Sequence, residues 1–213
     1  MTKNHNNFIN LAFHLAEKNI GRTGLNPTVG SVVVKNDAVI SSGVTSYNGR
    51  PHSEFNALSK LKNCSGATLY TTLEPCTHYG KTPPCVNIIL KKKIKKVYYA
   101  QEDQDSRTFR KAKKFLNYNG IKSKLINSKK FNKFYKSYFY NKKFSMPYVS
   151  AKIAISKDFF TINKHNKWVT NDLSRKNVHL LRYKHNCIIS TSKSINYDNS
   201  LLNCRINGLN NHR

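Results

Sequence analysis

Three short segments of this 213-residue chain carry the side chains best suited to binding one metal ion. They are Pro51-His52-Ser53-Glu54, Glu74-Pro75-Cys76 and Pro83-Pro84-Cys85. One imidazole and two thiolates suit a tetrahedral Zn²⁺ whose fourth position is left to water, as in catalytic rather than structural sites. A fold that uses this pattern has to bring His52, Cys76 and Cys85 to one point, so no other part of the sequence constrains the fold as strongly.

Glu54 follows His52 by two residues, close enough to reach water at the metal without binding the metal itself. Zinc lowers the pKa of that water, and a nearby carboxylate can take the proton and return it to a leaving amine. The signature of zinc deaminases is His-x-Glu followed by Pro-Cys-x-x-Cys. This chain matches the first half, but eight residues separate Cys76 from Cys85. The alternative is a structural zinc site or a pair of buried thiols, and His78 is the nearby candidate for the fourth ligand that a structural site needs.

Apolar periodicity and turn residues predict the order of the elements in the first two thirds of the chain. Helices are expected at residues 7–18, 52–61, 83–92 and 107–119, and strands at residues 29–35, 38–44, 67–73, 96–100 and 121–126. This order, with two paired strands followed by alternating helices and strands, implies a sheet layered with helices. His52 and Cys85 then lie at helix starts, where the positive end of the helix dipole favours thiolate over thiol.

The remainder of the chain is less regular. Residues 129–144 interleave aromatic side chains with lysines, which could stack nucleic-acid bases. Their helix-like spacing favours a packing face instead. Strands at residues 148–155 and 186–190 and a helix at residues 171–183 are expected to follow.

The formal net charge of +27 invites a nucleic-acid hypothesis. The basic residues are mostly Lys and are spread along the whole chain. We therefore favour a proteome-wide shift in amino-acid composition over a dedicated nucleic-acid-binding surface. Weak non-specific binding to polyanions is expected in either case. No stretch has the roughly 18–20 consecutive apolar residues of a membrane span, and the polar N-terminus lacks the core of a signal peptide. A soluble cytoplasmic protein that does not enter the membrane is therefore expected.

Three motifs together resemble the deaminase domain of the bacterial riboflavin-biosynthesis deaminase/reductase family. They are Asn26-Pro27-Thr28-Val29-Gly30, Pro51-His52-Ser53-Glu54 and the run from Gly66 to Cys85 that includes Thr71-Thr72-Leu73-Glu74-Pro75-Cys76 and the long insert. The resemblance implies an α/β fold, a three-layer α/β/α cytidine-deaminase-like domain with a mixed sheet, at residues 1–145. It also implies one Zn²⁺ per chain, held by His52, Cys76 and Cys85, with Glu54 as the catalytic residue.

The implied reaction is hydrolytic deamination of 2,5-diamino-6-ribosylamino-4(3H)-pyrimidinone 5′-phosphate to 5-amino-6-(5-phosphoribosylamino)uracil. Asn26, His78 and Lys81 are the candidates for binding this small phosphorylated substrate. Two departures bear on substrate affinity: Thr45 stands where the family usually has His, and Asp103-Gln104-Asp105-Ser106 replaces an Asp-Pro-Asn-Pro loop. A nucleoside or nucleic-acid deaminase, and a decayed zinc module that binds polyanions, are the alternatives. A homodimer is also left open.

Residues 146–213 resemble the opening of the family's NADPH-dependent, dihydrofolate-reductase-like domain, which makes the segment an incomplete reductase domain. By match to the family pattern, Arg182 and Arg205 fall at substrate positions. Four further residues fall at cofactor positions: Ala154, Trp168, Ser194 and Asp198. NADPH is expected to bind only if the site is completed elsewhere, so the reductase step is expected to be absent from this chain.

Overall fold

The computed structural model describes residues 3–126, 129–161 and 168–209. The chain forms two compact units, Met1–Tyr148 and Val149–Arg213. The first unit contains the three expected metal ligands and Glu54, and its sheet determines where they lie.

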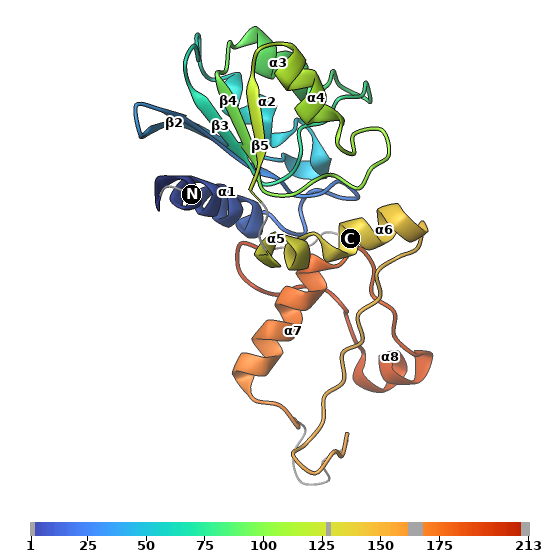
Figure 1. Ribbon diagram of the computed structural model, residues 1–213. Coiled ribbons are helices and arrows are strands. Elements are labelled where there is room, and N and C mark those ends of the chain that lie inside the picture. Colours follow the sequence, from blue (N-terminus) through green and yellow to red (C-terminus); the bar gives the residue numbers. More distant parts are fainter. Residues whose placement is uncertain (1–2, 127–128, 162–167, 210–213) are drawn as a thin grey trace. The chain divides into compact units, whose positions relative to one another are not determined.

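A five-stranded mixed sheet with the order β2-β1-β3-β4-β5 forms the centre of the first unit (Figure 1). Its strands are β1 (Gly30–Lys35), β2 (Ala38–Val44), β3 (Thr68–Thr71), β4 (Lys96–Tyr99) and β5 (Lys122–Leu125). β1 pairs antiparallel with β2 and β3, whereas β3 with β4 and β4 with β5 are parallel pairs. The five strands form where the sequence predicts them, most of them slightly shorter than expected.

The hairpin of β1 and β2 follows from the residues of its turn. Asn36 and Asp37 both have a positive φ, of 50° and 58°. Positive φ at both central residues is typical of a type I′ turn, whose twist matches that of two paired strands. β1 is buried along all but its last residue, which explains its continuous apolar run Val32–Val34.

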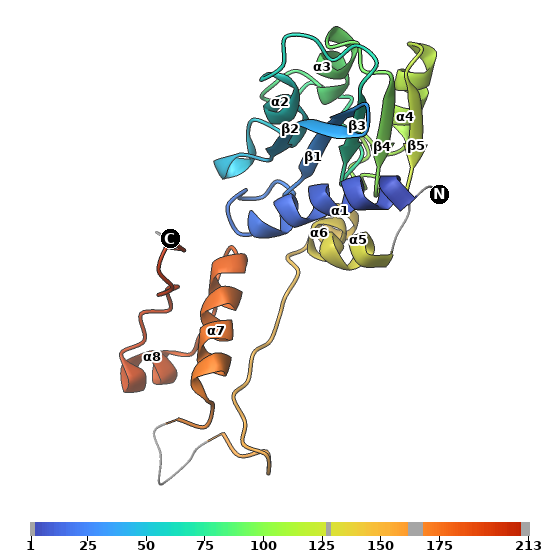
Figure 2. The ribbon, with the colours of Figure 1, turned by 90° about the vertical axis from the view of Figure 1, so that its left-hand side faces the viewer.

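Three helices cover one face of this sheet: α1 (Lys3–Lys18), α5 (Lys129–Phe134) and α6 (Lys136–Phe144) (Figures 1 and 2). The core here joins Phe13 of α1 with Phe131 of α5, whose rings meet edge to face at 5.3 Å. Phe131 and Tyr135 are both buried. The aromatic residues of 129–144 therefore form a packing face, as predicted.

The opposite face is covered by α2 (Ser53–Leu58), α3 (Cys85–Lys91) and α4 (Lys111–Tyr118). Leu58, Ile89 and Leu116, one from each helix, are fully buried against the sheet. The unit therefore has the three α/β/α layers expected from the sequence (Figure 2). Since α2 and α3 begin at the expected metal ligands, the candidate site lies on this side of the sheet.

The second unit contains two helices in its described residues, α7 (Asp172–Lys184) and α8 (Ser192–Asp198). Asn171 caps α7 by accepting from the backbone N–H of Ser174 at 2.9 Å. The prediction of strands at 148–155 and 186–190 is wrong: both segments are irregular. A strand needs a neighbour to pair with, and no strand occurs among the described residues of this unit. Within the described ranges, none of the helices has the length and apolarity that crossing a membrane requires.

Candidate metal centre

His52, Cys76 and Cys85 come together from the ends of three elements. His52 immediately precedes α2, Cys76 follows β3, and Cys85 opens α3. One ligand atom from each residue lies within 4.8 Å of the other two. Nδ1 of His52 is 3.3 Å from the sulfur of Cys85 and 3.6 Å from that of Cys76. Nitrogen and sulfur ligands bound tetrahedrally to zinc lie roughly 3.5 Å apart, so the spacing of these atoms fits a zinc ion.

The electrostatics of the two sulfurs also suit metal binding. The Cys85 thiol, hydrogen-bonded to Cys76, lowers the pKa of Cys76, and His52 lowers it further. The same bond raises the pKa of Cys85, because the two sulfurs share one proton, and burial raises it further. The hydrogen bond that the ring of His52 donates to the sulfur of Cys76 raises the pKa of His52. The cluster therefore holds one thiolate readily, and a cation is the partner that would stabilise the second.

Glu54 lies at this cluster and is 4% exposed. Its Oε2 is 3.5 Å from the sulfur of Cys85 and accepts from the Ser53 hydroxyl at 3.1 Å. Ser53 in turn is 2.8 Å from the buried hydroxyl of Ser31 on β1. Burial raises the pKa of Glu54, and His52 opposes this effect. A carboxylate in this position can hold or release a proton within reach of the three ligand atoms.

Comparison with known proteins agrees with this geometry. Residues 2–101 match the family model of the cytidine and deoxycytidylate deaminase zinc-binding region. The chain is 34% identical over 203 residues to RibD, a riboflavin biosynthesis protein, of Bacillus amyloliquefaciens, and 36% identical to RibD of Haemophilus influenzae. These matches cover 93% of this chain but only 55% and 54% of the relatives, so the chain spans about half their length.

Solved structures give the same result. RibD of Acinetobacter baumannii superposes with a TM-score of 0.87 at 32% identity, covering 97% of this chain and 59% of that one. A diaminohydroxyphosphoribosylaminopyrimidine deaminase/5-amino-6-(5-phosphoribosylamino)uracil reductase from Thermotoga maritima also gives 0.87, at 30% identity, and the match covers 96% of this chain and 60% of that one. The chain is thus similar to RibD proteins over nearly its whole length.

The insert between the two cysteines contacts the loop that precedes α4. His78 Nδ1 is 3.0 Å from the hydroxyl of Thr108, and Thr77 donates to the carbonyl of Arg107 at 3.2 Å. Burial lowers the pKa of His78, which favours a neutral imidazole. Lys81 lies exposed on the same insert.

Asn26 lies beside the segment that leads to His52. Its side chain packs so closely on Gly49 that a Cβ at Gly49 would be 2.1 Å from Asn26 Nδ2. Gly49 also has a φ of +84°, a conformation that favours glycine. Thr45, where a His was expected from the RibD family pattern, is buried, and its hydroxyl accepts from the backbone N–H of Val29 at 2.9 Å.

A buried acidic network supports the site, and the sequence did not indicate it. Glu74 accepts from the backbone N–H groups of Asp103, Arg110 and Ala112 at 3.0–3.2 Å. Burial raises the pKa of Glu74 to about 6, against these hydrogen bonds. Glu74 stands two residues before Cys76, so it ties the cysteine's loop to the start of α4. Its position directly before Pro75-Cys76 was the available signal.

The loop after β4 is fixed to α6 by one ion pair and one hydrogen bond. Asp105 binds Arg107 at 2.6 Å and Lys142 at 2.9 Å, and Asp103 accepts from Tyr138 at 3.0 Å. Arg107 and Lys142 hold the pKa of Asp105 well below its usual range. This loop replaces the one expected from the family pattern, and it is ordered by charge pairs instead of prolines.

In the second unit, the structure brings the two arginines at expected substrate positions close together. Arg182 Nη1 is 3.5 Å from Nδ1 of His179, and the backbone N–H of Arg205 donates to the same nitrogen at 3.2 Å. Burial lowers the pKa of Arg182, and the charge of Arg205 adds to this effect. A basic cluster of this kind suits an anionic group.

The four residues at expected cofactor positions are distributed over the second unit. Ser194 and Asp198 lie one turn apart on α8. Trp168 precedes α7, and the guanidinium of Arg175 lies 4.8 Å above its ring. Ala154 is partly buried in the irregular segment that was expected to be a strand.

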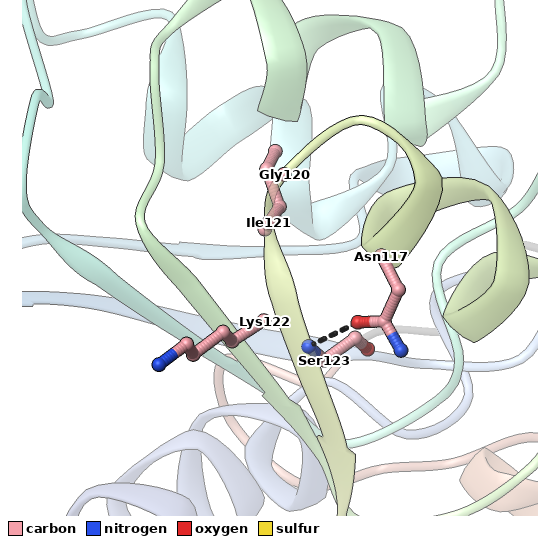
Figure 3. A pocket seen from close by; sticks show the side chains of 5 residues that line it. All are labelled: Asn117, Gly120, Ile121, Lys122 and Ser123. Carbon is pink, nitrogen blue, oxygen red and sulfur yellow. Dashed lines mark hydrogen bonds between the residues drawn. The ribbon is translucent and has the colours of Figure 1, made fainter.

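A shallow hollow lies elsewhere in the first unit, at the turn between α4 and β5 (Figure 3). It is lined by Asn117, Gly120, Ile121, Lys122 and Ser123, and Asn117 Oδ1 accepts from the backbone N–H of Ser123 at 2.9 Å. None of these residues is a His, Cys, Asp or Glu that could hold a metal, so the cluster of His52, Cys76 and Cys85 is the candidate site.

Proposed function

We propose that this chain hydrolyses the 2-amino group from 2,5-diamino-6-ribosylamino-4(3H)-pyrimidinone 5′-phosphate. The products would be ammonia and 5-amino-6-(5-phosphoribosylamino)uracil, an intermediate of riboflavin biosynthesis. The observation that carries this proposal is the cluster of His52, Cys76 and Cys85 with the buried carboxylate of Glu54 against it. The likeness to RibD proteins supports the choice of substrate, since the similar Thermotoga maritima protein is a deaminase for this class of compound.

His52, Cys76 and Cys85 would hold one Zn²⁺, and Glu54 would move the protons. When bound, zinc supplies a Lewis acid that brings the pKa of water toward neutrality. Glu54 takes a proton from the attacking water, whose oxygen forms a bond to the ring carbon that carries the amine. The carbon–nitrogen bond then breaks, and Glu54 returns the proton to the departing nitrogen, which leaves as ammonia. The burial that raises the pKa of Glu54 suits a group that must both accept and donate.

Three further residues of the first unit would supply the remaining contacts. Asn26, His78 and Lys81 would bind the substrate, with neutral His78 offering a hydrogen bond and Lys81 a charge for the phosphate. Arg182 and Arg205 would bind the phosphorylated product at residues 146–213, beside the cofactor positions Ala154, Trp168, Ser194 and Asp198. Residues 1–145 would form the deaminase domain.

Liquid chromatography of the reaction tests the proposal. The zinc-loaded chain is incubated in parallel with the ribosylaminopyrimidinone phosphate, with cytidine and with single-stranded RNA. Conversion of the first compound alone, with ammonia released in equal amount, supports the proposed function. Deamination of cytidine or RNA in its place would reject the proposed substrate while keeping the zinc chemistry.

A further inference from the structure

The second nitrogen of His52 has an unusual neighbour for a metal-binding histidine. Nη1 of Arg50 lies 3.1 Å from Nε2 of His52 and donates to the hydroxyl of Thr82 at 2.6 Å. A guanidinium has only donors, so Nε2 must be the acceptor in this contact. Nδ1 then carries the ring's proton, and it is this nitrogen that faces the sulfurs of Cys76 and Cys85.

Metal binding at Nδ1 reverses that arrangement. A neutral imidazole bound to metal through Nδ1 carries its proton on Nε2, and this N–H normally donates to a carboxylate, a carbonyl or water. With Arg50 in place, two donors would face each other. The contact seen between Arg50 and His52 therefore belongs to the metal-free tautomer, and the guanidinium has to leave Nε2 when a metal binds.

Arg50 is positioned to bind an anion once it leaves. Among the described residues, no group accepts from its Nε or Nη2, so one edge of the guanidinium offers the paired donors that bind phosphate in bidentate fashion. Arg50 is half-buried, and Nη2 lies against Gly80, where an added Cβ would be 3.2 Å away. Gly80 and Thr82 flank Lys81 on the insert. Arg50 therefore contacts the same stretch that carries the exposed Lys81.

We infer that Arg50 is an anion-binding residue that couples metal binding at His52 to the binding of a phosphate-type anion beside residues 80–82. Metal at Nδ1 releases the guanidinium, and an anion held by Arg50 keeps it away from Nε2. Each ligand therefore strengthens the other, and the effect has the same size in both directions. The inference rests on the proposed role of His52 as a metal ligand, and its anion in the reaction would be the substrate's phosphate.

The test measures zinc affinity of the full, initially metal-free chain by competition with a zinc-binding dye, with free zinc held constant by a metal buffer. Sulfate is the anion probe, compared with chloride at equal ionic strength. For the unmodified chain, we expect sulfate to tighten zinc binding by roughly fivefold or more, the lower range of measured couplings. For Arg50→Gln, whose amide oxygen can accept from Nε2–H, we expect zinc to bind roughly tenfold more tightly without sulfate and sulfate to have no effect.

Three variants control this test. Lys114→Gln removes one exposed charge on α4 and should keep the sulfate effect. Arg50→Lys retains a charged donor and should bind zinc as the unmodified chain does. His52→Ala should lose zinc, and zinc retention there would reject the proposed ligand set rather than the coupling.

Two results decide between the inference and its alternatives. Unchanged zinc affinity in Arg50→Gln, or an equal sulfate effect in that variant and the unmodified chain, would overturn it. A kinetic experiment then shows whether the anion bound by Arg50 is the substrate's phosphate or a free anion. Arg50→Gln should raise KM for the phosphorylated substrate while leaving KM for its dephosphorylated form unchanged. An equal rise for both forms would show that Arg50 does not bind the substrate's phosphate.

Discussion

The backbone N–H of Cys85 donates a 3.2 Å hydrogen bond to the sulfur of Cys76. The first residue of α3 thus stabilises a thiolate nine positions earlier in the chain, across the whole insert. The insert is therefore a closed loop whose two ends are the two sulfur ligands. This explains how the chain can depart from the short Cys-x-x-Cys spacing and still form one compact cluster.

This relationship predicts which cysteines carry the metal. Cys85→Ala, Cys76→Ala and His52→Ala should each lose the single zinc ion, because three protein ligands are already the minimum for a catalytic site. Their unfolding temperatures should fall as well, since metal affinity contributes to folding. Elemental analysis of the purified variants measures the first effect. Cys187→Ala, at an exposed cysteine outside the cluster, is the matched control and should keep its zinc. Full zinc in Cys85→Ala would contradict the ligand set.

Asp105 should stabilise the loop after β4 through charge. Asp105→Asn should lower the free energy of unfolding by about 1.5–3 kcal/mol at pH 7, the range for hydrogen bonds to charged groups. The folded-state pKa of Asp105 is depressed, so this contribution is complete above its ordinary value of 3.8 and disappears as pH falls through the lower folded value. Urea unfolding of both proteins at several pH values measures it. A difference that grew on acidification would be inconsistent with this assignment.

Tyr135 tests whether α5 and α6 are packing elements. Its buried hydroxyl lies 2.6 Å from that of Thr72 and donates to the carbonyl of Thr28 at 3.1 Å. Tyr135→Phe should cost about 1–2 kcal/mol of stability because a buried polar partner is lost. Tyr118→Phe, at a side chain that is 91% exposed, should cost almost nothing. Equal stability of the two variants, measured by thermal unfolding, would argue against this hydroxyl as an anchor of the helices.

The second unit should be unable to reduce the deaminated product by itself. A reductase has to hold a nicotinamide against its substrate on a complete scaffold, and the described part of residues 149–209 contains no strand. We expect no loss of NADPH absorbance when the chain is added to deaminated substrate. Substrate-dependent oxidation above a heat-inactivated control would show that a second copy or another protein completes the site.

How far the sequence predicted this protein depends on which interactions decide each element. The sheet and helices of the first unit were predictable because Val32–Val34, Asn36-Asp37 and the cysteine segments carry strong local signals. Residues 148–155 have the apolar alternation of a strand, but strand formation also requires a pairing partner. Periodicity within one segment does not report on that partner, so the prediction was wrong there.

The residues of the candidate site also differ in how far the sequence predicted them. His52, Cys76 and Cys85, which the structure brings together, and Glu54 beside them were predicted as site residues from residue type and spacing. The contacts of Arg50 and Glu74 were missed because they are made with residues far along the chain: Arg50 with Thr82, and Glu74 with Ala112. One arginine among 37 basic residues has no distinguishing mark until its neighbours are known.

The most direct test of the account is the activity of Glu54→Gln with the ribosylaminopyrimidinone phosphate, measured beside its zinc content. The amide keeps the shape of the side chain but cannot carry the proton. We expect full zinc occupancy and a loss of kcat by roughly 10²–10⁴, the range for removing a general acid–base group. Glu17→Gln, on the exposed side of α1, should keep full activity. Near-normal ammonia release by Glu54→Gln, or loss of its zinc, would contradict the proposed mechanism.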